Sequence, residues 1–266
     1  MLQQVVKASA AGLDVVRRPT EGLVVLIYHR VGGSGGSVDL DPGLFDEQMA
    51  ELAASGMLRS LDEGLETVAA PGSAERHLVS VTFDDGTADF VENALPILVR
   101  HQVPATLYLA TKFADEGLDF PGGGRAISWG GLRDARTTGL IDVGAHTHSH
   151  VLLDRLEDRL VADELDRSNG LIEDQLGAPA RHFAYPKAVL GSPTAREAVR
   201  SRYRSASVAG TRANPIGGTD PHLLQRSPVQ VADGMRWFRR KASGGLRLED
   251  DLRRRINQRR YAGATT

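Results

Sequence analysis

The sequence predicts a single α/β domain with the architecture of a distorted or incomplete (β/α) barrel. Short apolar runs rich in β-branched residues alternate with longer segments of helical periodicity from residue 23 to residue 231. Such alternation is typical of parallel βαβ units. The repeats number fewer than the eight of a regular barrel. A chain of 266 residues with 41% hydrophobic and 25% charged residues fits one large globular domain.

The predicted strands are short, apolar segments bounded by turn residues. They are Leu23–Tyr28, Leu78–Phe83, Thr106–Ala110, Leu140–Ala145, Arg181–Tyr185, Ser205–Ala209 and Leu223–Val231. Because parallel strands need crossover connections, we expect helices between them.

The predicted helices carry apolar residues at helical spacing. They begin at Asp41-Pro42, lie around 91–99, run over 128–136 and 156–176, and begin again at Ser192-Pro193. Two of these starts place proline directly after a residue that can cap a helix. Gly177 is a plausible C-cap for the long helix over 156–176.

Composition excludes several classes of site and protein. The chain has no cysteine, which excludes disulfides, thiol nucleophiles, iron–sulfur clusters and zinc sites that use cysteine. A metal ion would therefore be held by histidine and carboxylate. The longest apolar run near the N-terminus, Leu23–Tyr28, is shorter than the roughly 20 residues of a membrane helix and lacks signal-peptide flanks. We therefore predict a cytoplasmic protein.

Charge divides the chain into an acidic body and a basic end. We expect an N-terminal extension over 1–22, the domain proper over 23–235 and a basic extension over 236–266. The last segment holds ten basic and three acidic residues in a chain whose net charge is −2. Trp237 and Phe238 there could touch anionic lipid or a lipid-linked substrate, but a solvated, partly helical tail is the favoured interpretation. The acidic body argues against nucleic-acid binding.

Ionisable side chains follow four of the predicted strands. They are His29, Asp84 with Asp85, the histidines of 146–150, and Tyr185 to Lys187. In barrels and open α/β sheets, active sites gather at the carboxyl ends of the strands. The sequence therefore predicts one site built from these four segments.

Two adjacent carboxylates, Asp84 and Asp85, lie in the segment Thr82-Phe83-Asp84-Asp85-Gly86. An Asp-Gly turn is common and needs no function. At a strand end, however, the two side chains can diverge around a shared site, where one ligates a cation and the other accepts a proton. From this segment alone, both interpretations stay open.

Three of the eight histidines lie within five positions, at His146, His148 and His150. One helical turn would place His146 and His150 on the same face and turn His148 elsewhere. Two imidazoles and one carboxylate form an open three-ligand site suited to Zn²⁺ and a water molecule. Co²⁺, Ni²⁺ and Fe²⁺ remain alternatives.

These motifs resemble those of the polysaccharide deacetylases, the NodB-homology domain of carbohydrate esterase family 4. Thr82–Gly86 with His146-Thr147-x-x-His150 is similar to the first two family motifs. The segments Val25–Val31 and Phe183–Pro186 resemble the branch that deacetylates poly-N-acetylglucosamine. The resemblance covers Leu23–Val231. It implies a distorted (β/α) barrel and metal-dependent removal of N-acetyl or O-acetyl groups from an amino-sugar-containing glycan or glycoside.

The resemblance also implies roles for individual residues. Asp84 matches the catalytic base, while Asp85, His146 and His150 match the ligands of a divalent metal, with Zn²⁺ expected first. His29 matches the general acid of the poly-N-acetylglucosamine branch, and His222 is a weaker candidate for that role.

The chain departs from the family pattern in its third motif. The arginine that pairs with the base is replaced by Ala184, and the residues after Pro186 are Lys187 and Ala188. Tyr185 and Lys187 are expected at the substrate and oxyanion position, where the backbone N–H of Lys187 could serve. These departures keep open an alternative, a non-catalytic glycan-binding protein with the same fold.

Overall fold

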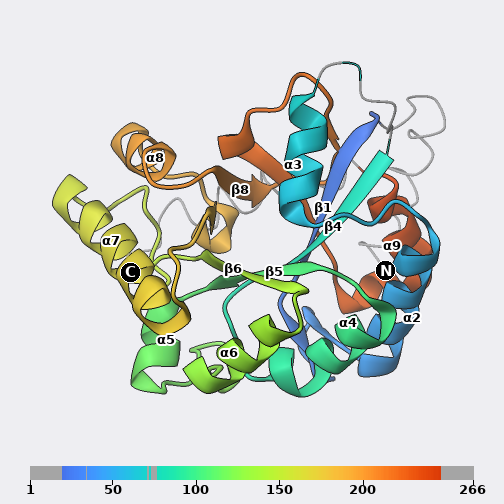
Figure 1. The fold of residues 1–266 in the computed structure, drawn as a ribbon, viewed down its shortest axis with the longest axis horizontal. Helices are drawn as coiled ribbons and strands as arrows, with labels where there is room; N and C mark the ends of the chain where they lie inside the picture. The colour runs from blue at the N-terminus through green and yellow to red at the C-terminus, as the bar shows by residue number, and fades with distance from the viewer. Residues whose placement is uncertain (1–19, 34, 71, 73–76, 247–266) are drawn as a thin grey trace.

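The computed structural model describes residues 20–33, 35–70, 72 and 77–246. In this part of the chain, seven parallel strands close into a barrel (Figure 1). They are β1 (Gly22–Tyr28), β4 (His77–Phe83), β5 (Ala105–Leu109), β6 (Ile141–Ala145), β7 (His182–Ala184), β8 (Ser205–Ala209) and β10 (Leu224–Pro228). The strands pair in that order, and β10 pairs back with β1. The predicted barrel and its strand segments are confirmed.

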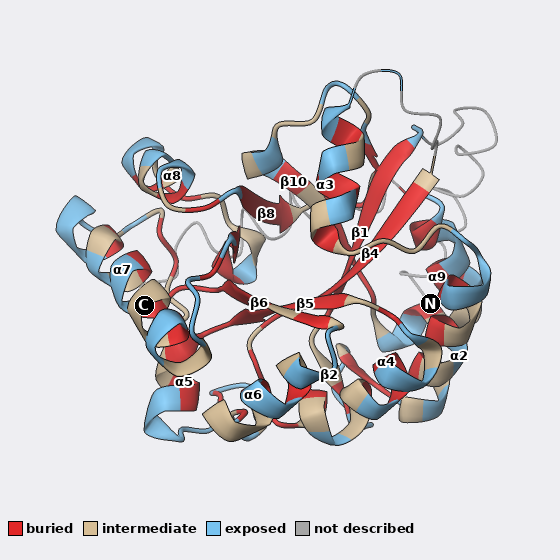
Figure 2. Cartoon of the chain, in the orientation of Figure 1, coloured by how far each residue is buried: buried red, intermediate tan, exposed pale blue. Residues whose placement is uncertain are grey.

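Helices connect the strands and cover the outside of the barrel. They are α2 (Pro42–Ala54), α3 (Leu61–Ala69), α4 (Leu95–His101), α5 (Thr111–Glu116), α6 (Trp129–Thr137), α7 (Asp158–Leu176), α8 (Pro193–Arg200) and α9 (Gly234–Ala242). Figure 2 shows buried strands surrounded by helices whose outer faces are exposed. The core therefore lies between the strands and the inner faces of these helices.

Short elements complete the fold. A π-helical turn, η1 (Phe90–Ala94), leads into α4. The described residues also form three 3₁₀ turns: η2 (Pro186–Ala188), η3 (Pro221–Leu223) and η4 (Val231–Asp233). The π-helical turn ends two residues before Pro96, whose missing N–H cannot make the usual helical bond. The two-residue strands β2 (Arg30–Val31) and β3 (Asp39–Leu40) pair with each other, and β9 (Asn214–Pro215) runs antiparallel to β1.

Helix starts and ends follow the signals seen in the sequence. The Asp41 carboxylate accepts from the N–H groups of Gly43 and Leu44 at the start of α2. Gly177 adopts the left-handed conformation at the end of α7. The local sequence therefore determines where these two helices lie.

The barrel interior is polar near its carboxyl end. Arg226 of β10 donates to Thr82 Oγ1 of β4 at 3.1 Å, and its guanidinium lies 4.9 Å from the ring centre of Tyr108 on β5. Strand β1 lies between β10 and β4 in the sheet. These contacts therefore cross the barrel and bring Arg226 into its interior.

The beginning of the basic extension belongs to the folded body. In α9, Trp237 is 4% exposed and Phe238 is fully buried. Arg239 makes a salt bridge to Glu51 of α2. The two aromatic side chains are packed inside the protein, so the structure does not support the lipid contact considered for them. Residues 1–19 of the expected N-terminal extension and 247–266 of the basic one lie outside the described residues.

No helix in the described ranges combines the length and the apolar character needed to cross a membrane.

Lys241 of α9 makes a completely buried ion pair, and we expect its loss to destabilise the fold. Its Nζ donates to Asp233 Oδ2 at 2.8 Å and to the Pro228 carbonyl at 2.7 Å. In Lys241→Met the Asp233 carboxylate stays buried without its cation. We expect a loss of about 3–5 kcal/mol in the free energy of unfolding, measured by urea denaturation. The double variant Lys241→Met/Asp233→Leu should recover much of this lost stability. A Lys241→Met variant as stable as the wild type would contradict the expectation.

Candidate active site

Three predicted metal ligands converge at the carboxyl ends of β4 and β6. The Nε2 atoms of His146 and His150 lie 3.6 and 3.2 Å from Asp85 Oδ1. The centroids of the two imidazole rings are 5.0 Å apart. One ligand atom from each residue lies within 4.8 Å of the others. Three side chains from two loops are thus arranged around one point.

The backbone around these ligands is not helical. Residues 146–150 form a loop, and Thr147 and His150 have positive φ angles of 62° and 61°. The expected helical turn is therefore wrong, although both imidazoles reach the same point. Five of the seven described non-glycine residues with positive φ lie in the loops after β4, β6 and β7, and Asp85 is one of them. Such conformations cost about 1–3 kcal/mol each, and they persist where the surrounding structure holds them.

Gly86 allows the chain to turn directly after the two aspartates. Its φ is +96°, and a Cβ atom there would lie 2.4 Å from Leu109 Cδ1. Any other residue would therefore need the Leu109 side chain to shift and would adopt a backbone angle that L-residues rarely take. The positive φ, together with this close contact, explains glycine after Asp85.

His146 is held in the tautomer that suits a metal ligand. Its Nδ1–H donates to the Ala184 carbonyl at 2.7 Å, so the lone pair of Nε2 faces Asp85. Burial lowers the pKa of His146 to about 4, so the imidazole is neutral near pH 7. Burial acts against ionisation of Asp85, yet the hydrogen bond from His150 and the nearby His29 hold its pKa well below the ordinary value. This donor set fits a divalent cation.

Asp84 is paired with an arginine that the sequence analysis missed. Arg226 Nη1 lies 2.7 Å from Asp84 Oδ1, and Nη2 lies 2.9 Å from Oδ2. Arg226 is fully buried and Asp84 is 5% exposed. The family position at Ala184 on β7 lacks its arginine, and β10, which is separated from β4 only by β1, supplies one instead. The available signal was an arginine in the middle of the predicted strand Leu223–Val231.

The pairing keeps Asp84 in its carboxylate form. Burial alone would raise the pKa of Asp84, but the charge and the hydrogen bonds of Arg226 oppose it, so the pKa lies below the ordinary value. Thr82 and Tyr108 hold the guanidinium that orients the carboxylate. Asp84 is thus arranged to accept a proton near neutral pH.

His29 follows β1 and lies close enough to both aspartates to favour their ionised forms. Its Nδ1 is buried and has no hydrogen-bond partner among the described residues. His222 lies elsewhere, in η3, which precedes the amino end of β10. Its Nε2–H donates to the Tyr203 carbonyl, and its Nδ1 faces Arg200. The structure thus brings His29, but not His222, to the aspartates.

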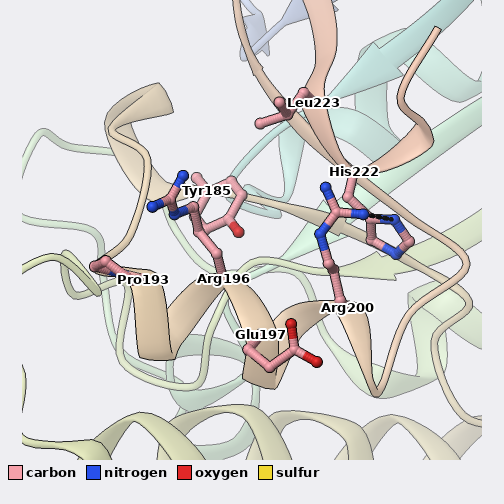
Figure 3. Close-up of a pocket in the computed structure, with 7 residues that line it drawn as sticks. All are labelled: Tyr185, Pro193, Arg196, Glu197, Arg200, His222 and Leu223. Carbon is pink, nitrogen blue, oxygen red and sulfur yellow. Dashed lines mark hydrogen bonds between the residues drawn. The ribbon is translucent and has the colours of Figure 1, made fainter.

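Tyr185 and Lys187 have different surroundings. The Tyr185 N–H donates to the Ser207 carbonyl, its ring packs edge-on against Phe183, and its side chain lines a cavity beside α8 (Figure 3). Lys187 is exposed in the loop after β7, with φ of 51°. The side chain of Tyr185 therefore faces α8, away from the expected oxyanion position.

Comparison with known proteins identifies the family of this chain. The sequence model of the family described as polysaccharide deacetylase matches residues 72–206. The chain belongs to the polysaccharide deacetylase family. This deacetylase is 23% identical over 216 residues to YxkH of Bacillus subtilis (strain 168), a protein provisionally named as a polysaccharide deacetylase. The match covers 80% of this chain and 72% of YxkH. A shorter match of 98 residues, 26% identical, covers 37% of this chain and only 27% of YlxY from the same organism.

Solved structures share the fold. IcaB from Ammonifex degensii superposes with a TM-score of 0.74 and 26% identity, covering 83% of this chain and 98% of that one. The deacetylase PplD of Streptococcus pyogenes gives a TM-score of 0.71 at 19% identity, covering 84% of this chain and 99% of that one. The family and these neighbours support a carbohydrate deacetylase.

Proposed function

We propose that this deacetylase is a metal-dependent hydrolase that removes acetyl groups, N-acetyl before O-acetyl, from amino sugars of a glycan. The observation that carries the proposal is the pairing of two arrangements at one barrel end. Asp85, His146 and His150 form a site for a divalent cation, and Asp84 beside them is held ionised by Arg226. A glycan-binding protein without activity would need neither a buried base nor its arginine.

Asp85, His146 and His150 would hold the metal. Imidazole and carboxylate without thiolate suit Zn²⁺ first and Co²⁺ or Ni²⁺ next. When bound, the ion supplies Lewis-acid polarisation of the acetyl carbonyl and of water.

The chain's own residues would move the protons. Asp84 takes the proton of the attacking water while a C–O bond forms at the acetyl carbon. Arg226 keeps Asp84 ionised and oriented until that transfer. His29 then donates a proton to the sugar nitrogen as the C–N bond breaks, which gives acetate and a free amine. The backbone N–H of Lys187 is proposed to donate to the developing oxyanion.

Replacing a ligand is expected to remove the metal without unfolding the protein. His146→Ala deletes one of three ligands, and we expect zinc affinity to fall by at least about 100-fold, as measured by competition with a chelating dye. His101→Ala is the matched control, because His101 contacts Asp46 on the helical surface instead. Equal zinc affinity in both variants would contradict the assigned site.

Acetate release tests the activity itself. We expect the zinc-loaded protein to release acetate from oligomers of N-acetylglucosamine, and chelation to abolish release until zinc is restored. An O-acetylated sugar in parallel distinguishes the two linkages. Oligomer binding without acetate release from any of these substrates would overturn the proposal in favour of a glycan-binding protein.

A further inference from the structure

A second cavity, of about 180 Å³, lies beside α8 and away from the Asp85–His146–His150 cluster. Tyr185 lines it at the barrel, Arg196 and Arg200 line it from α8, and His222 lines it from η3 (Figure 3). Neither the metal site nor the proposed proton transfers use this cavity. Its volume is well below the roughly 300 Å³ at which pockets for larger ligands begin.

Two hydrogen-bond donors in this cavity lack protein partners. The Nε atom of Arg196 is buried without a hydrogen-bond partner, and its guanidinium has no ion pair among the described residues. The Tyr185 hydroxyl has no hydrogen-bond partner among those residues either. Burial raises the pKa of Tyr185 to about 12, so this hydroxyl keeps its proton. Polar groups in such surroundings are normally satisfied by a ligand or by water.

Two arginines and one glutamate line the cavity. Arg196 and Arg200 are four residues apart on α8, so both side chains project from one face of the helix. Figure 3 shows their guanidinium groups on either side of the Tyr185 hydroxyl, and Glu197 of the same helix also lines the cavity. Arg200 shares its guanidinium with Asp220 and His222. Arg196 makes no ion pair among the described residues, although the Glu197 carboxylate lines the same cavity.

We propose that this cavity binds a small oxyanion, a phosphate or a carboxylate group, between Arg196 and Arg200. Guanidinium presents several N–H donors in a planar fork that matches both groups. The Tyr185 hydroxyl adds a neutral donor to one ligand oxygen. The cavity is too small for a glycan chain, so the occupant is a free anion or one anionic substituent of a larger molecule. This inference does not depend on the proposed deacetylase activity.

The test is calorimetric titration of the full chain with inorganic phosphate at low ionic strength. We expect a dissociation constant on the order of 1 mM. Arg196→Gln, which removes the charge and the guanidinium fork but keeps a polar side chain, should weaken binding about 10-fold or more. Arg159→Gln is the matched control, because Arg159 is exposed on α7 and does not line the cavity. Glucose 6-phosphate and glucuronate distinguish phosphate from carboxylate, and neutral glucose should not bind there.

Further variants keep the result decisive. Tyr185→Phe removes a single oxygen and should weaken phosphate binding about 3- to 10-fold, which tests the cavity even if Arg196→Gln does not fold. Wild-type phosphate affinity in a folded Arg196→Gln variant would overturn the proposal. If Arg196→Gln does not fold, wild-type affinity in Tyr185→Phe would overturn it instead. So would phosphate binding that is lost in His146→Ala and kept in Arg196→Gln, because the anion would then lie at the metal cluster. Absence of binding at 20-fold above the expected constant, about 20 mM, would overturn it as well.

Discussion

Asp84→Asn is expected to lower kcat for acetate release by about 10²–10⁴-fold while leaving the metal in place. The amide has nearly the shape of the carboxylate but cannot take a proton from water. The ligands Asp85, His146 and His150 are unchanged, so zinc stoichiometry should equal that of the wild type. Measurement of kcat together with metal content separates loss of the base from loss of the ion.

The control for this variant is Asp134→Asn, which changes an exposed aspartate on α6. It should keep both the rate and the metal. If Asp84→Asn retained a rate within a factor of about three of the wild type, Asp84 would not be the base, and another residue would have to accept the proton.

Arg226→Met is expected to affect both stability and the pH profile. The Asp84 carboxylate would stay buried without its partner, so we expect a loss of about 3–5 kcal/mol in the free energy of unfolding. The pKa of Asp84 should rise, because burial is no longer opposed by the guanidinium. The acidic limb of the kcat/KM profile should therefore move to higher pH. At pH values below the raised pKa of Asp84, most of the activity should be lost.

The same pair predicts how stability depends on pH. The pKa of Asp84 is lower in the folded protein than in the unfolded chain, so its stabilisation is complete above the unfolded pKa of about 3.9. It is lost as the pH falls through the folded pKa. The difference in unfolding free energy between wild type and Arg226→Met should therefore be largest near pH 7 and shrink at lower pH.

Two controls separate charge from geometry. Arg226→Lys keeps a cation but not the two parallel hydrogen bonds, and should give intermediate stability and an intermediate acidic limb. Arg204→Met breaks a partly exposed pair with Asp62 and should cost no more than about 1 kcal/mol. An unshifted acidic limb in Arg226→Met would show that Arg226 supports the fold without tuning Asp84.

Several elements could be predicted because their signals are local. The strand Leu23–Tyr28 is a continuous apolar run, and a strand buried on both faces needs one. Asp41 and Gly177 mark helix ends through hydrogen bonds and backbone angles that depend only on near neighbours. The closeness of His146 and His150 along the chain also indicated a shared site, although not through the helical turn that was expected.

Other elements gave no sufficient signal. Helix α5 has only six residues, too few to show a helical period. Helix α9 carries Arg239, Arg240 and Lys241 in its last turn, and such a run of basic residues predicts a solvent-exposed surface. The burial of Lys241 becomes understandable only with Asp233 beside it. The loop that brings His146 and His150 together depends on left-handed residues that no period reveals.

By itself, the sequence determined the alternation of strands and helices, the identity of the carboxylates and imidazoles, and their positions at strand ends, because each of these depends on residues close together along the chain. Only the tertiary structure decided that Arg226 serves Asp84, a residue 142 positions away. Closure of the barrel by pairing of β10 with β1 places the two side chains across the same interior. A contact made by closure of the whole sheet leaves no mark on the local sequence of either partner.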